Sequence, residues 1–149
     1  MIDPHVDVVE PGDHHVVSQL PALEHEARTA LVDQRGGSQW LIDHPEVADG
    51  WADRAAHADV LVALIDDVVV GYLVAEDADP VLRIDQVWVT PEARELGFGD
   101  EMLATAMERG RGRGMAAVEG EALPGDRHTK NLYERAGIVA RLITTYRAL

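Results

Sequence analysis

One strand-to-helix connection constrains this chain more than any other part of its sequence. Residues 81–89 alternate as in a half-buried β-strand, Thr90-Pro91 ends that strand, and an amphipathic helix begins near Gly97. Gly97 and Gly99 stand in the first turn of the helix, where a glycine costs about 1 kcal/mol relative to alanine. Because the free N–H groups of a first turn attract anions, and a missing Cβ lets a bulky anion approach them, the pattern predicts an anion site. A tight turn without a ligand is the alternative.

The remaining periodicities predict a single α/β (α+β) domain over residues 1–149, with helices flanking a mixed sheet. The predicted strands are His5–Val9, Val60–Ile65, Val68–Ala75, Val81–Val89, Met115–Leu123 and Val139–Tyr146. The predicted helices are His14–Asp33 (with a kink or an early first turn at Pro21), Ser38–Ile42, Val47–His57, Gly97–Arg109 and Asp126–Ala136.

Acidic residues are concentrated in the first part of the chain. Residues 1–90 hold eighteen Asp and Glu against four Arg, whereas the charges of residues 91–149 balance. Such a chain repels nucleic acid, which is bound by clustered Lys and Arg. Two interpretations stay open: the charge provides solubility or salt tolerance, or it favours a cationic substrate.

Several classes of protein are excluded by composition. The chain has no cysteine, so it has no disulfide, thiolate zinc site or cysteine nucleophile. No apolar run approaches the roughly 18 residues of a membrane span, and the N-terminus lacks the pattern of a signal peptide. We therefore expect a cytoplasmic protein with neither a membrane nor a nucleic acid as partner. Adjacent histidines on a helix point apart, so Asp13-His14-His15 does not predict a metal site.

The glycine turn fits neither of two common phosphate-binding motifs. No Gly-Lys-Ser/Thr follows it, as a P-loop requires, and Met102 stands where a dinucleotide-binding fingerprint has its third glycine. Val89-Thr90-Pro91 followed by Arg94-Glu95-Leu96-Gly97-Phe98-Gly99 instead resembles the GNAT superfamily of acyl-coenzyme A (CoA) dependent N-acetyltransferases. In that family, a V-x-P strand end leads into an R/Q-x-x-G-x-G/A loop.

A second motif at the expected separation strengthens the resemblance. The family's N-x-x-A-x-x-x-L-Y-x-x-x-G-F helix is matched by Leu132-Tyr133 and Gly137. The sequence departs from this motif at three positions, with Asp126 for asparagine, Thr129 for alanine and Ile138 for phenylalanine. The resemblance covers about residues 58–140. It implies the GNAT fold, a mixed, mostly antiparallel central sheet of about six strands flanked by helices.

The resemblance also implies how acetyl-CoA is held as a cosubstrate, with no metal. A backbone N–H at the end of the strand, within Val87–Val89, would serve as the oxyanion donor, and the pantetheine would add along the same edge. The pyrophosphate would rest on the amides of residues 94–100, with Arg94 as ion partner. The expected cofactor-binding residues are Val87, Trp88, Val89, Arg94, Glu95, Leu96, Gly97, Phe98, Gly99, Asp100, Asp126, Thr129 and Tyr133.

The implied reaction is direct attack of a neutral amine on the thioester, which needs an acid and a base. Tyr133 matches the family's general acid. The alternative interpretation is an aromatic side chain that only packs in the core. Glu121 and Asp85 are the candidate bases, with Glu119 as a further alternative. Glu119 and Glu121 share one face of the predicted strand, and three interpretations stay open: two carboxylates that raise each other's pKa as a base needs, an electrostatic clamp on a cationic amine, or a solvated face. A water relay is a further open route.

The function predicted from these residues is transfer of acetyl from acetyl-CoA to a primary amine, with a cationic small molecule or peptide as acceptor. A non-catalytic acyl-CoA-binding sensor or regulatory module is the alternative from another class, and an acyltransferase that uses longer chains is a third. One final strand, Val139–Tyr146, leaves a sheet edge open. We therefore expect a homodimer that covers this edge.

Overall fold

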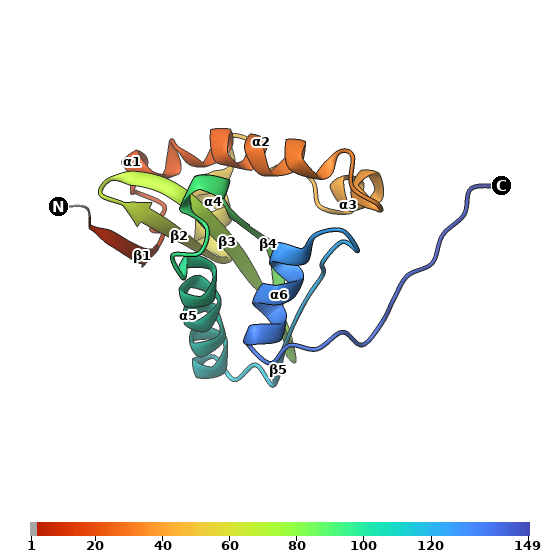
Figure 1. Ribbon diagram of the computed structural model, residues 1–149. Coiled ribbons are helices and arrows are strands. Elements are labelled where there is room, and N and C mark those ends of the chain that lie inside the picture. The colour runs from red at the N-terminus through yellow and green to blue at the C-terminus, as the bar shows by residue number, and fades with distance from the viewer. Residues whose placement is uncertain (1–2) are drawn as a thin grey trace.

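A computed structural model describes residues 3–149, which form one five-stranded sheet flanked by helices (Figure 1). The strand order follows the chain, from β1 to β5, and the first four strands pair antiparallel. Only β4 and β5 run parallel, which gives the mixed, mostly antiparallel sheet expected from the sequence. The strands are β1 (Pro4–Val8), β2 (Asp59–Ile65), β3 (Val68–Ala78), β4 (Val81–Val89) and β5 (Ala117–Gly120).

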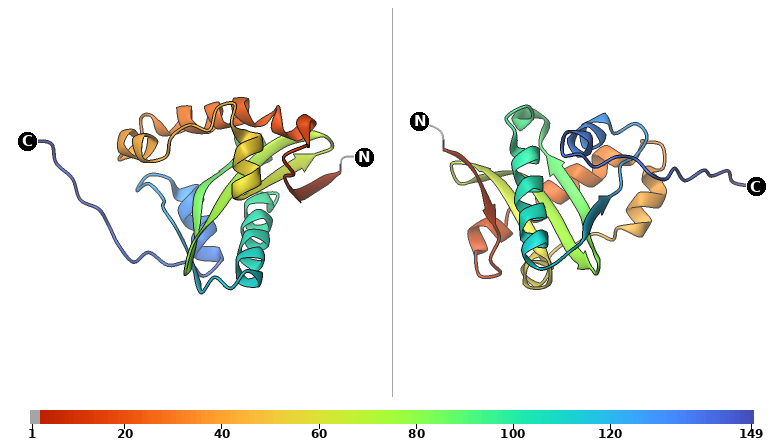
Figure 2. Two further views of the ribbon diagram at one scale, coloured as in Figure 1. Left: turned by 180° about the vertical axis from the view of Figure 1, so that it is seen from behind. Right: turned by 90° about the horizontal axis from the view of Figure 1, so that it is seen from below.

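Helices cover both faces of the sheet, as the views in Figure 2 show. One face carries the N-terminal helices α1 (His14–Val17), α2 (Leu20–Leu31) and α4 (Trp51–His57). The opposite face carries α5 (Phe98–Gly112) and α6 (Arg127–Arg135). Two further elements lie near the sheet ends: α3 (Gly37–Asp43) and the short 3-10 helix η1 (Pro91–Ala93).

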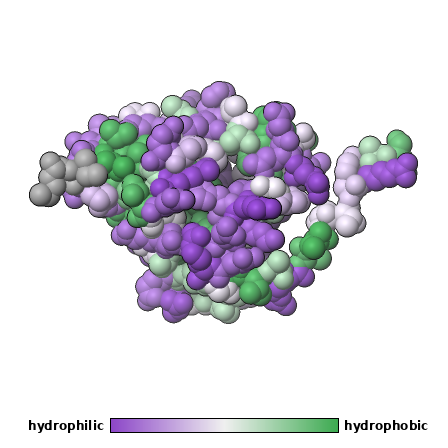
Figure 3. All heavy atoms as spheres, viewed as in Figure 1, coloured by the Kyte–Doolittle hydropathy of each residue, from purple (hydrophilic) through white to green (hydrophobic). Residues whose placement is uncertain are grey.

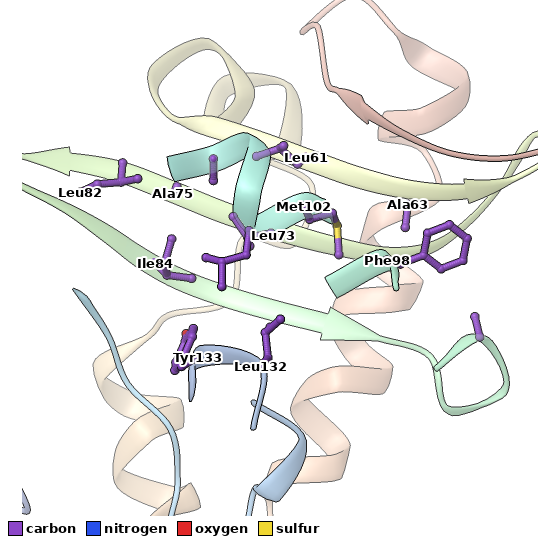
Figure 4. Close-up of a cluster of buried hydrophobic side chains, with 13 residues drawn as sticks. Leu61, Ala63, Leu73, Ala75, Leu82, Ile84, Phe98, Met102, Leu132 and Tyr133 are labelled. Atoms are coloured by element: carbon purple, nitrogen blue, oxygen red, sulfur yellow. The ribbon is translucent and has the colours of Figure 1, made fainter. Parts of the chain in front are cut away.

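Alternation along the strands builds one core on each face of the sheet. Leu61 and Leu73 point toward α5 and α6, whereas Val60 and Val74 point toward α2 and α4. Figure 4 shows the first of these cores, in which Leu132 and Tyr133 of α6 join side chains from the strands and α5. The second core is completed by Trp51, which is fully buried.

The sheet opens between β4 and β5, and this opening positions the site. The parallel pairing runs only from Val81 with Ala117 to Ile84 with Gly120. Residues 86–89 of β4 remain paired with β3 on one side, Asp85 lies at an irregularity of that pairing, and in the described part of the chain residues 85–89 have no strand partner on the other side. The second half of β4 therefore presents a free backbone edge beside the loop that follows β5.

Several of the predicted elements differ from the structure. The predicted helix Val47–His57 begins only at Trp51, and the predicted strand Val68–Ala75 continues to Ala78. The predicted helix over residues 14–33 is two helices, because α1 ends at Val17 and Pro21 occupies the first turn of α2, where no N–H is needed. The predicted strand Met115–Leu123 keeps only Ala117–Gly120, since β4 and β5 diverge beyond Gly120. The expected sixth strand, Val139–Tyr146, is absent, and residues 138–149 form no helix or strand.

Candidate active site

A cleft opens where β4 and β5 diverge, and it collects most of the predicted catalytic residues. Asp85 and Gln86 enter it from β4, Tyr133 from α6, and Glu121 from the loop after β5. The α2–α3 region closes the other side of the cleft. The lining residues are Ala27, Arg28, Leu31, Trp40, Tyr72, Asp85, Gln86, Val87, Trp88, Glu121, Ala122, Leu123, Asp126, Thr129 and Tyr133.

Tyr133 is held in the cleft by close contact with β5. A Cβ on Gly120 would lie 2.6 Å from the Tyr133 hydroxyl oxygen and 2.8 Å from its Cζ, so the ring rests where only glycine leaves room. The side chain is buried, and this burial raises the pKa of the Tyr133 phenol, with the carboxylates of Asp126, Glu121 and Asp85 adding to the effect. The phenol is therefore neutral near pH 7 and has a proton to give.

A histidine joins the two candidate bases. His44, at the C-terminal end of α3, places Nδ1 2.9 Å from Asp85 Oδ1 and Nε2 3.1 Å from Glu121 Oε1. The hydrogen bond to Asp85, together with Glu121, raises the pKa of His44 despite its burial. Burial raises the pKa of Asp85, but His44 and Arg54 outweigh this effect, so the pKa of Asp85 lies below its usual value.

The position of His44 is fixed by groups from α2 and α3. Arg28 of α2 donates from Nη1 to the backbone carbonyl of His44 over 2.6 Å. Trp40, one turn earlier on α3, stacks on the imidazole with ring centroids 4.1 Å apart. Glu24 is fully buried on α2 and accepts hydrogen bonds from the backbone N–H groups of Val47 and Ala48, which secures the loop after His44. The histidine is therefore held from three directions.

The two glycines of the predicted anion site have different structural roles. Gly97 is the N-cap of α5 with a φ of 83°, and a Cβ there would meet no atom within 4 Å. Gly99 has an ordinary helical position, but a Cβ there would lie 3.4 Å from Leu132 of α6. Gly97 therefore supplies the left-handed turn, whereas a Cβ at Gly99 would make only an ordinary van der Waals contact with α6.

The other residues of this turn surround the start of α5 without lining the cleft. Glu95 has a left-handed φ of 68°, and Leu96 is exposed. The Phe98 side chain is buried in the core, so only its backbone is available to a ligand. Asp100 accepts a hydrogen bond from Arg135 of α6 over 2.9 Å.

The end of β4 is held by Arg94, which follows it in the chain, and by Glu26 of α2. Arg94 donates from Nε to the Val89 carbonyl over 2.9 Å, and its guanidinium lies 4.6 Å from the ring centroid of Trp88. Trp88 in turn donates from Nε1 to Glu26 of α2 over 2.7 Å, and Thr90 donates to the same carboxylate. Arg94 thus lies against the strand end, with its Nε already engaged.

Asp126 and Thr129 form the N-terminal cap of α6. One Asp126 oxygen accepts from the Thr129 backbone N–H over 3.1 Å, and the other accepts from the Thr129 hydroxyl over 2.7 Å. This pairing explains both departures from the family motif, because an aspartate that caps a helix suits a threonine three residues later. Both residues line the cleft.

The structure shows which sequence-based interpretations of the site need correction. Glu119 does not line the cleft, and it pairs with Arg83, 3.7 Å away, rather than with Glu121. His44 is not among the site residues predicted from the sequence, because its contacts lie 41 and 77 residues away along the chain. A useful signal lies in the arginines of the acidic region, since Arg28 and Arg54 both serve the site.

The described residues hold no group of three His, Asp or Glu placed to bind a metal ion, and none of their helices is long and apolar enough to cross a membrane. A profile of the family described as "Acetyltransferase (GNAT) family" matches residues 21–138. The chain belongs to the GNAT acetyltransferase family.

Solved structures of other GNAT-fold enzymes are similar over the whole chain. The aminoglycoside N-acetyltransferase AAC(6')-Iy in complex with CoA is 16% identical, with 99% of this chain and 96% of that chain covered and a TM-score of 0.72. An aminoglycoside acetyltransferase, HMB0005, from an uncultured soil metagenomic sample is 18% identical, with 100% and 99% covered and a TM-score of 0.71. A ribosomal-protein-alanine N-acetyltransferase from Brucella melitensis biovar Abortus 2308 is 16% identical, with 99% of each chain covered and a TM-score of 0.64. No curated protein matches the chain.

Proposed function

We propose that this GNAT protein transfers an acetyl group from acetyl-CoA to a primary amine by direct attack, without an acyl-enzyme. The observation that carries the proposal is that Tyr133, Glu121 and Asp85 line one cleft beside the free edge of β4. Direct transfer needs one group to take a proton from the acceptor ammonium and another to protonate the leaving thiolate. Glu121 and Asp85 are suited to the first task, and the neutral phenol of Tyr133 is suited to the second.

The arrangement of β4 and α5 fits a CoA molecule. The edge of Val87, Trp88 and Val89 has no strand partner on its outer side in the described residues. Arg94 occupies the Val89 carbonyl, and the remaining backbone groups of this edge are available to an extended pantetheine; a backbone N–H there is our proposed oxyanion donor. The open space at Gly97 leaves the first amides of α5 available to a pyrophosphate. Arg94, Asp126 and Thr129 flank this path in the proposal, with the Arg94 guanidinium as the ion partner. That AAC(6')-Iy was solved in complex with CoA supports the assignment.

The acceptor in this proposal is a cationic small molecule. Asp85, Glu121 and Asp126 place three carboxylates along the cleft, and the formal net charge of the chain is −14. Such a field attracts a polyamine or an aminoglycoside-like compound. The similarity to aminoglycoside acetyltransferases supports a small molecule, and a peptide amine remains the comparison acceptor in the test below.

The test is an acetyl-CoA turnover screen over polyamines, aminoglycosides and lysine peptides, with the wild type and Tyr133→Phe. We expect turnover with a cationic amine and a fall in kcat of about a hundredfold in Tyr133→Phe, because the thiolate loses its proton donor. CoA should raise the Tm of both proteins. Without any rise in Tm, the cofactor assignment is wrong, and tight CoA binding without turnover on any amine would support the sensor alternative instead.

A further inference from the structure

His44 connects three parts of the chain that are distant in sequence. Its imidazole lies between Asp85 of β4 and Glu121 of the loop after β5. Figures 1 and 2 show α3 beside this loop. Both carboxylates line the cleft, but His44 does not and lies behind them. The His44 side chain is only 8% exposed, Asp85 is 18% exposed and Glu121 is 71% exposed. The three residues thus form a path from the cleft surface to a buried ring.

The hydrogen bonds of the Asp85–His44–Glu121 bridge determine how many protons it holds. An ionised carboxylate only accepts hydrogen bonds, so a ring that binds one carboxylate through each nitrogen must carry a proton on both. The bridge therefore holds one proton more than a neutral imidazole would bring. Of the three groups, the imidazole is the one with a pKa suited to holding that proton near neutral pH, because its pKa is raised while that of Asp85 is lowered.

The other charged groups around His44 support the same distribution. The guanidinium of Arg54 on α4 lies 3.5 Å from the second oxygen of Asp85, and its positive charge keeps Asp85 ionised. Arg54 is also hydrogen-bonded to Glu76 of β3. Arg28 of α2 is directed at the backbone carbonyl of His44, not at the ring. Trp40 covers the ring face with an uncharged surface. The ring nitrogens therefore face carboxylates only, and both of these belong to the site.

We propose that His44 is a positioning residue for the base of this reaction and stores the proton that Glu121 removes from the acceptor ammonium. This inference rests on the proposed amine acetylation. An N–H bond of the ammonium breaks as an O–H bond forms on Glu121. That O–H bond then breaks as an N–H bond forms at Nε2 of neutral His44, whose Nδ1–H is donated to Asp85. An imidazolium between the two carboxylates, which accounts for both hydrogen-bond distances, is the product of this transfer, and the proton leaves to solvent through exposed Glu121.

The proposal predicts how kcat depends on pH. At low pH the ring already carries the second proton, so Glu121 has no acceptor behind it and turnover is slow. As the pH rises through the raised pKa of His44, the ring becomes neutral and kcat increases. A histidine that only supports the fold does not produce this ionisation in kcat.

The first experiment needs no acceptor and is independent of acetyl transfer. In the substrate-free protein, ¹⁵N NMR of the histidine rings should show a His44 pKa above 6.5 with both nitrogens protonated below it. Asp85→Asn should lower this pKa more than Glu121→Gln, since Asp85 is the dominant partner. A His44 pKa below 6.5 in the wild type would overturn the proposal, whatever the protein acetylates.

The second experiment compares pH profiles of kcat for the wild type, His44→Gln, Glu121→Gln and the double variant. The matched control is His57→Gln, which changes an exposed histidine of α4 that pairs only with Asp53 of its own helix. We expect a fall in kcat of about tenfold or more in each single variant, loss of the His44 ionisation in His44→Gln, and no further loss in the double variant, because the two residues act as one unit.

Three results would contradict the second experiment's expectation and the proposal with it. These are an unchanged pH profile in His44→Gln, a rise in the amine KM with kcat unchanged, and losses that multiply in the double variant. Where His44→Gln does not fold, the exposed Glu121→Gln variant and the NMR titration still decide. Failure of every amine in the turnover screen would instead refute the proposed function and leave the NMR result standing.

Discussion

The two glycines at the start of α5 differ in whether the fold requires glycine. Gly97 has a φ of 83°, which costs a residue with a Cβ about 1–2 kcal/mol, so Gly97→Ala should lower the free energy of unfolding by that amount. Gly99→Ala should leave it unchanged or raise it by up to about 1 kcal/mol, because alanine has the higher helix propensity and its Cβ makes an ordinary contact with Leu132. Urea unfolding of both variants measures the difference.

Gly112→Ala is the control for this pair, since a Cβ there meets no atom within 4 Å and its φ is not positive. It should be as stable as the wild type or slightly more stable. If Gly97→Ala is as stable as Gly99→Ala, the left-handed cap is not what requires glycine at position 97.

The sequence predicts part of the candidate site. Tyr133 follows from an ordered motif, whereas Glu121 and Asp85 follow from their places just before the Tyr133 helix and the glycine turn, and the structure brings all three to one cleft. His44 was not named, because nothing local to His44-Pro45 indicates partners on β4 and after β5. Contacts between side chains on different elements depend on tertiary packing, which spacing along a single sequence does not encode.

At the scale of elements, α6 and β5 act together to place the phenol. A Cβ on Gly120 would lie 2.6 Å from the Tyr133 hydroxyl, so Gly120→Ala should displace the ring. We expect kcat to fall about tenfold to a hundredfold, as small misplacements of a catalytic group do, while CoA still raises the Tm. Steady-state kinetics with the best amine from the screen checks this.

Gly112→Ala is again the control. It should retain wild-type kcat, because position 112 is on α5 and has open space around it. Wild-type kcat in Gly120→Ala would show that the contact between β5 and Tyr133 has no catalytic consequence. A loss of CoA-dependent stabilisation in Gly120→Ala would point to misfolding around β5 rather than to displacement of one ring.

Elements with a strong pattern were predicted well, and the differences have physical causes. Strand β4 has the predicted bounds, Val81–Val89, because its alternation is flanked by an acidic turn and a Thr-Pro stop. The predicted strand at Val139–Tyr146 has the same kind of apolar composition, yet no strand of this chain pairs with it in the described residues. Strand formation needs a partner, and β-propensity alone does not supply one.

At the scale of the whole molecule, the C-terminal segment after Gly137 is the unusual feature. It extends away from the domain (Figure 1), and Figure 3 shows hydrophobic residues along it. The large hydrophobic side chains exposed in this segment are Val139, Leu142, Ile143, Tyr146 and Leu149. Exposed apolar side chains in such number on an extended segment are typical of a surface that is covered in an assembly.

The sheet offers a place for this segment in a second copy of the chain. Strand β5 is the last in the sheet order, so its outer edge has no strand partner in the described residues. An extended chain of about ten residues spans roughly 35 Å, which is enough to reach another subunit. We predict a homodimer in which the C-terminal segment of each copy adds to β5 of the other, in a closed two-fold arrangement.

Sedimentation at micromolar concentration measures this prediction. The full chain should sediment as a dimer, and a chain that stops after Ile138 should sediment as a monomer, since Ile138 still donates its backbone N–H to the Tyr133 carbonyl and packs on the core. Leu142→Ser with Ile143→Ser should also give a monomer, whereas Thr144→Ser with Thr145→Ser should not. A monomeric full chain, or a dimer that survives truncation, would contradict a role of the C-terminal segment in the assembly.

The same segment links assembly to the active site. Because α6 ends only two residues before Gly137, a segment bound to the partner's β5 would also hold the helix that carries Tyr133. The truncated monomer should therefore show a lower kcat.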